Sequence, residues 1–165
     1  MDRNSLEYME QQFSTARMNL LVVVSFTVTN IIMLLAGTYS QFLFSASIPY
    51  LLTAFGIAMD MQAGGNTYVT TALIISAAIL LVYVVLWLLS KKRPALLYVA
   101  FGLFVVDTVL LLGFALLSGS ILDEILNLGL HGWVLFILFK GASTGMKLNR
   151  IAATESPSYT SDLDL

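Results

Sequence analysis

The chain has 165 residues, of which 58% are hydrophobic and 11% are charged, with a formal net charge of −2. A soluble globular domain carries about 25% charged residues, so this composition predicts one domain embedded in a membrane. The absence of cysteine excludes disulfides, thiolate nucleophiles and thiolate metal sites, and a single histidine excludes a His-x-x-x-His site. There is also no phosphate-binding glycine loop and no basic patch interleaved with aromatic residues. We therefore expect no enzyme activity, no cofactor, no metal and no nucleic-acid partner.

Residues 1–17 are predicted to form an N-terminal amphipathic helix. Leu6, Met9, Phe13 and Ala16 recur at helical spacing, whereas the opposite face carries mostly charged and amide side chains. Such a helix lies on a membrane surface or packs on a partner helix. The alternative is that these residues are the polar beginning of the first spanning helix and continue directly into it.

The first predicted spanning segment covers residues 18–37. It is too long for the apolar part of a cleaved signal peptide, so we expect it to be retained as a membrane anchor. Most of its polar side chains are hydroxyls, which bond to the carbonyl four residues back in the same helix. Asn30 is different, because its amide needs a partner across a helix interface.

The second segment, residues 40–62, has two interpretations. Pro49 interrupts it, and proline is favoured in the first turn of a helix but disrupts a helix interior. A helix capped by Ser47 is about 22 Å long, which is shorter than the ~30 Å hydrocarbon core of a bilayer. We therefore expect a short re-entrant helix, with a fifth spanning helix as the alternative.

Three further apolar segments complete a predicted four-helix transmembrane bundle within a domain that covers residues 18–150. They are residues 68–89, 95–117 and 121–139, separated by a basic turn and by the polar turn Ser118-Gly119-Ser120. Residues 151–165 are acidic, rich in serine and threonine, and lack helical periodicity. We expect them to form a disordered acidic tail.

The eight basic residues distinguish the possible topologies, because basic residues accumulate on the cytoplasmic side. Five crossings place only two of them there if the N-terminus is inside, and six if the N-terminus is outside. Four crossings with a re-entrant second segment place all eight there. This arrangement predicts a protein of the cell membrane with both termini in the cytoplasm. The residues are Arg3, Arg17, Lys91, Lys92, Arg93, Lys140, Lys147 and Arg150.

Asp107 and His131 are ionisable residues in the middle of apolar segments. A carboxylate at the centre of a membrane helix costs about 2.5–3.5 kcal/mol, so it marks a structural or functional site. Each residue lies about ten residues from the 118–120 turn, or about 15 Å deep, so an antiparallel pair would share one layer. Asn30 would lie within reach of them. The pair either clasps the helices together or carries and gates protons.

A polar stripe leads toward the histidine along the last segment. Asp123, Asn127 and His131 recur at i, i+4 and i+8, which places them on one helix face. This stripe is either a polar half-channel or a face packed against segment 40–62. Asp60, near the end of that segment, either joins this face or extends from the helix end to water.

Gly141 and Gly145 form a small-xxx-small pair, which permits close helix approach and would support dimerisation. Two other stretches resemble segments of small multi-pass bacterial membrane proteins with no established activity. They run from Phe42 to Tyr50, FLFSASIPY, and from His131 to Leu135, HGWVL. This resemblance implies a bacterial cytoplasmic membrane and brings no activity with it.

The sequence favours a small structural or accessory membrane protein. Such a protein would lie in the lipid bilayer and bind another membrane protein, or a second copy of itself, through its helix faces. The alternative is an oligomeric channel or proton-coupled transporter built around Asp107 and His131.

Overall fold

The computed structural model describes residues 3–38 and 42–155, which form five helices and contain no strand. The helices are α1 (Arg3–Leu35), α2 (Ser47–Ala63), α3 (Thr67–Ser90), α4 (Leu96–Ser118) and α5 (Ile121–Glu155). Four of them, α1, α3, α4 and α5, are long and apolar enough to cross a membrane. The prediction of an all-helical chain with four long apolar helices is confirmed.

Helix α1 is continuous from Arg3 to Leu35, so residues 3–17 are not a separate amphipathic helix but the polar beginning of the first long apolar helix, which was the alternative interpretation. No glycine or proline occurs between Arg3 and Leu35 to interrupt the backbone hydrogen bonds. Ala16 and Leu20 are fully buried, so tertiary packing supports the helix across the predicted boundary. The helix ends at Leu35, and Gly37 follows with a φ of +78°, which suits a residue without a side chain.

Helix α5 continues past the predicted end at residue 139 and reaches Glu155. The expectation of a disordered tail is therefore wrong for residues 151–155, and residues 156–165 lie outside the described part of the chain. The reason is packing against α1. A side chain at Gly141 would collide with Ala16, and one at Gly145 would collide with Phe13. The predicted small-xxx-small pair thus permits close helix approach within the chain itself.

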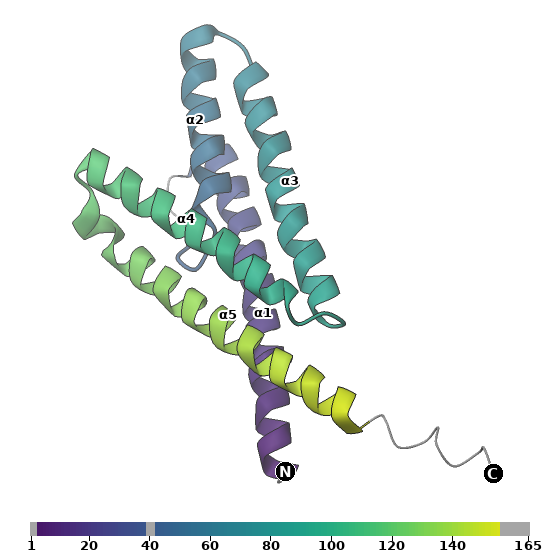
Figure 1. Ribbon diagram of the computed structural model, residues 1–165. Helices are drawn as coiled ribbons and strands as arrows, with labels where there is room; N and C mark the ends of the chain where they lie inside the picture. The colour runs from purple at the N-terminus through teal and green to yellow at the C-terminus, as the bar shows by residue number, and fades with distance from the viewer. Residues whose placement is uncertain (1–2, 39–41, 156–165) are drawn as a thin grey trace, which may run out of the picture.

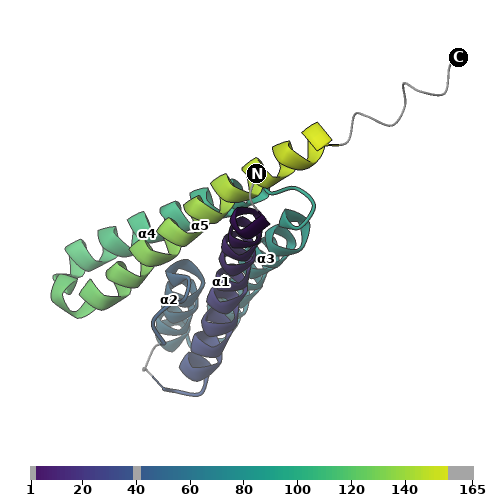
Figure 2. The same ribbon diagram turned by 90° about the horizontal axis from the view of Figure 1, so that it is seen from below.

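The helices form two antiparallel hairpins, α2–α3 and α4–α5, and α1 packs against α3 and α5 (Figures 1 and 2). The α2–α3 hairpin is tight because Gly56 leaves no room for a side chain. A Cβ there would lie 2.9 Å from the Tyr68 carbonyl oxygen and 2.9 Å from the Ala72 Cβ. The glycine therefore sets how closely α2 and α3 approach.

Helix α2 begins beside α1, some distance before the C-terminal end of α1. The Ala46 N–H donates to Thr27 Oγ1 at 2.8 Å, and Thr27 lies about 12 Å before the end of α1. The chain has thus turned back along α1 before α2 starts. Helix α2 then runs back toward the C-terminal end of α1. Gly37, which follows α1, lines one cavity together with Met61 near the end of α2 and Asn66 in the α2–α3 turn.

The segments that carry most of the basic residues gather at one end of the molecule, away from the turn between α2 and α3 (Figure 1). The N-terminal half of α1, the α3–α4 turn and the end of α5 line a common cavity that includes Lys91 and Lys92. Arg17 links two of these elements: its Nε donates to Ser90 Oγ at 3.0 Å and its Nη2 to the Trp87 carbonyl at 3.1 Å. A cation at this position stabilises the C-terminus of α3.

Candidate functional site

The carboxylate of Asp107, halfway along α4, caps the N-terminus of α2. Its Oδ1 accepts the Ile48 N–H at 2.7 Å, and its Oδ2 accepts the Ser47 N–H at 2.9 Å. The first N–H groups of a helix have no partner within the helix, and its dipole favours an anion there. Ala46, at the cap position of α2, makes no side-chain hydrogen bond, so another helix supplies the cap that we predicted at Ser47.

His131 of α5 completes this cluster. Its Nε2 lies 3.1 Å from Asp107 Oδ2 and 3.3 Å from Ser47 Oγ, and its Nδ1 lies 2.9 Å from the Asn127 carbonyl oxygen. We call Asp107 and His131 the buried pair, because each is only 1% exposed. The Phe104 ring stacks on the imidazole at a centroid distance of 4.9 Å and helps to exclude water.

The hydrogen-bond partners restrict the orientation of the His131 imidazole. Nδ1 faces the Asn127 carbonyl oxygen, which can only accept, so Nδ1 carries a hydrogen. Nε2 lies between the Asp107 carboxylate and the Ser47 hydroxyl, so both ring nitrogens have their partners within the chain.

Asn30 does not contact the buried pair, although the sequence placed it within reach. Its Nδ2 donates to the Phe42 carbonyl and to Ser45 Oγ, both at 2.8 Å, and its Oδ1 accepts the Phe42 N–H at 2.7 Å. Together with Thr27, which accepts the Ala46 N–H, it holds the loop that leads into α2. Asn30 thus positions the start of α2 from one side, and Asp107 positions it from the other.

The same loop contains Phe44 with a φ of +75°. A bulky side chain in the left-handed region is an outlier that costs about 1–3 kcal/mol. The surrounding hydrogen bonds from Asn30 and Thr27 offset this cost. The sequence of this loop does not indicate the strain, because contacts with α1 impose the conformation.

Asp60 has a role that the sequence analysis did not anticipate. Its Oδ1 accepts the Tyr68 N–H at 3.0 Å, and its Oδ2 accepts the Val69 N–H at 2.7 Å. Both sequence interpretations of Asp60 are therefore wrong: it neither joins the stripe on α5 nor extends to water. It caps α3 in the same way that Asp107 caps α2.

The stripe on α5 becomes less exposed along its length. Asp123 is exposed, Asn127 is buried, and His131 belongs to the buried pair. Asn127 Nδ2 donates to Glu124 Oε2 at 3.0 Å, and its Oδ1 is buried without a partner among the described residues. Glu124, which the sequence analysis did not select, is thus the carboxylate that contacts the stripe. Its i, i+3 spacing from Asn127 was a signal that could have identified it.

Within the described residues, no group of three histidine, aspartate or glutamate side chains is arranged to hold a metal ion. Comparisons with protein-family models, with curated proteins and with solved structures found no match for this chain. The resemblance to small bacterial membrane proteins and the absence of enzyme activity stay predictions.

Proposed function

We propose that this chain is an integral membrane protein in which α1, α3, α4 and α5 cross the bilayer and α2 is re-entrant. The outward side chains of α3 and α4 are mainly leucine, isoleucine and valine, and soluble proteins rarely expose so large an apolar surface. Re-entrant backbone must be covered by protein. Asp107, Asn30 and Thr27 provide this cover at the start of α2.

The proposed orientation places the basic end of the molecule in the cytoplasm, together with both termini. The beginning of α1, the α3–α4 turn and the end of α5 lie at that end (Figure 1). The opposite end carries Asp123 and Glu124 in the first turn of α5. This distribution of charge follows the positive-inside rule.

Single cysteines test this topology directly, because the chain has no cysteine of its own. Cysteines at Asn4 and Lys92 are expected to resist a membrane-impermeant thiol reagent applied to intact cells. Cysteines at Thr38, Asn66 and Ser118 are expected to react, and all five should react after the cells are opened. Reaction at Asn4 and Asn66 combined with protection at Thr38 would contradict re-entry and indicate five crossings.

The proposed role is that of an accessory protein, in which the buried pair is a structural clasp. The observation that carries this proposal is that the polar atoms of the buried pair find their hydrogen-bond partners within the chain. Both Asp107 oxygens and both His131 ring nitrogens have partners within the chain, and both side chains are closed to solvent. A transport or catalytic site needs groups that a substrate can reach. The pair instead joins α2, α4 and α5.

A groove between α2 and α4 offers the surface through which an accessory protein would act. Its volume is about 780 Å³, and every residue that lines it is apolar or glycine. Leu117, at its edge, is 92% exposed, and Gly113 has open space in front of its Cα. We propose that an apolar helix of another membrane protein packs here, since small residues permit close approach between membrane helices.

The test is purification in native lipid discs. Wild type is expected to retain a companion membrane protein in fixed proportion. Gly113→Trp, which fills the groove, is expected to lose it. Gly102→Trp is the matched control, because this glycine also lies on α4 and faces open space. Retention of the companion by Gly113→Trp, or its absence from wild type, would contradict the proposed role.

Proton-coupled transport is the second candidate, and the stripe on α5 favours it. Asn127 Oδ1, which has no partner among the described residues, is a buried acceptor between Glu124 and His131 and gives a proton carrier one polar step toward the buried pair. In liposomes with a pH gradient, this candidate requires proton flux that Asp107→Asn abolishes. The clasp requires that folded wild type carry none, so the assay separates the two candidates.

A further inference from the structure

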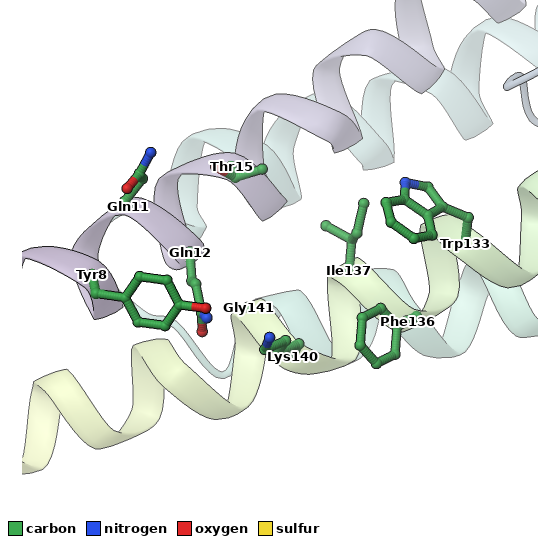
Figure 3. A pocket seen from close by; sticks show the side chains of 9 residues that line it. All are labelled: Tyr8, Gln11, Gln12, Thr15, Trp133, Phe136, Ile137, Lys140 and Gly141. Carbon is green, nitrogen blue, oxygen red and sulfur yellow. The ribbon is translucent and has the colours of Figure 1, made fainter. Parts of the chain in front are cut away.

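We propose that a cavity between the N-terminal half of α1 and the middle of α5 binds an anionic phospholipid. The phosphate would lie at Lys140, and an acyl chain would follow Trp133 and Phe136. The cavity has a volume of about 320 Å³ (Figure 3). The inference rests on the membrane insertion proposed above and adds a specific ligand to it.

The charge of the cavity suits an anion. Lys140 is the only charged residue among those that line it. No carboxylate of the described residues lies within 4.0 Å of its ammonium group, since the ion pairs among those residues are Arg3–Glu7 and Asp107–His131. The Lys140 Nζ lies 5.8 Å from the Phe136 ring centroid, which holds the ammonium near the cavity by a cation–π contact.

Helix α1 adds neutral hydrogen-bond donors on the opposite wall. Tyr8 and Gln12 extend from α1 toward α5 at the end of the cavity that contains Lys140 and Gly141 (Figure 3). The Gln12 Oε1 accepts the Thr144 hydroxyl at 3.2 Å, which leaves its NH₂ group as a donor. A phosphate beside Lys140 would therefore meet a cation on one wall and hydroxyl and amide donors on the other.

The other end of the cavity is apolar. Trp133, Phe136 and Ile137 line it, and they come from successive turns of α5 (Figure 3). Trp133 and Phe136 are each more than half exposed, so their rings are available to a ligand. A molecule with a phosphate at one end and a hydrocarbon chain at the other matches this division. A free phosphate would leave the apolar end unused.

The depth of the cavity also fits a lipid. Lys140 lies about 13 Å along α5 from His131, on the side of the basic end, and half of a hydrocarbon core is about 15 Å thick. With the buried pair near the bilayer centre, Lys140 reaches the level of the phosphate groups. Trp133 lies about 10 Å deeper, among the acyl chains. The polar and apolar ends thus follow the direction of a lipid in the cytoplasmic leaflet.

Native mass spectrometry of the purified protein tests this site with phosphatidylglycerol and phosphatidylcholine of identical acyl chains. Wild type is expected to prefer phosphatidylglycerol by about fivefold or more. Lys140→Gln should lose this preference, and Lys140→Arg should retain it. Lys147→Gln is the matched control, because Lys147 is exposed on the same helix and does not line the cavity. Equal losses in Lys140→Gln and Lys147→Gln, or no loss in Lys140→Gln, would overturn the proposal.

Two further arms identify the ligand as a lipid. Trp133→Ala should weaken the binding of both lipids without removing the preference for phosphatidylglycerol. Soluble glycerol phosphate should not compete at millimolar concentration, and effective competition would overturn the assignment to a lipid. Cysteine labelling tests membrane insertion separately. If the protein is inserted in the membrane but Lys140→Gln does not change its lipid preference, only this lipid site is refuted, and the proposed membrane insertion stands.

Discussion

Asp107→Leu is expected to lower the free energy of unfolding by about 3–5 kcal/mol, because it leaves buried polar groups without their acceptor. The Ser47 and Ile48 N–H groups and His131 Nε2 all bond to this carboxylate. His131→Leu should cost less, since Asp107 would keep both bonds to α2. Reversible unfolding in mixed detergent micelles measures the difference, and Val106→Leu, an exposed neighbour on α4, is the control.

The two variants should also be coupled. A double-mutant cycle is expected to give about 0.6–2 kcal/mol, the range for hydrogen bonds between membrane helices. The double change should not recover full stability, because the start of α2 would still lack its cap. Additive effects, or a greater cost for His131→Leu than for Asp107→Leu, would contradict the hydrogen bonds of the buried pair.

The conservative variant Asp107→Asn shows what the structure adds to the sequence. From the sequence alone the change would be mild, because an amide can still bond to His131. In the structure both carboxylate oxygens accept hydrogens, and an asparagine would turn an NH₂ group toward one of these donors. We therefore expect an intermediate cost of about 1–3 kcal/mol, measured by the same unfolding assay.

Gly141→Leu is the second substitution with a large expected effect. Any side chain at Gly141 would collide with Ala16, where α1 and α5 are in close contact. Overpacking of this kind costs about 1–3 kcal/mol or more. The same unfolding assay measures the loss, and it should also show that the two helices separate more easily in detergent.

Gly129→Leu is the matched control, because this glycine lies on the same helix and faces open space. Its effect should be neutral or slightly stabilising, since glycine is about 1 kcal/mol less favourable than alanine in a helix interior. Equal costs at Gly129 and Gly141 would show that the α1–α5 contact does not depend on the missing side chain.

Much of the fold follows from local features of the sequence. Long apolar runs identify four helices, because length and composition can be read from the sequence without knowing what each helix packs against. The polar turn 118–120 and the proline at Pro49 mark helix boundaries by backbone chemistry alone, and Gly119 indeed has a φ of +71°. Even the shared layer of Asp107 and His131 follows from counting helical rise on both sides of a short turn.

Three features were decided only by the tertiary structure. The polar residues near 17 and 140 predicted helix ends, but packing between α1 and α5 keeps both helices continuous there. Asp60 looked like a surface residue and is a buried cap of α3. The cap of α2 comes from Asp107 on another helix. A sequence reports which residues need a partner, because polarity and spacing are local properties. Which partner each one finds depends on how distant helices meet, and that is determined only when the chain is folded.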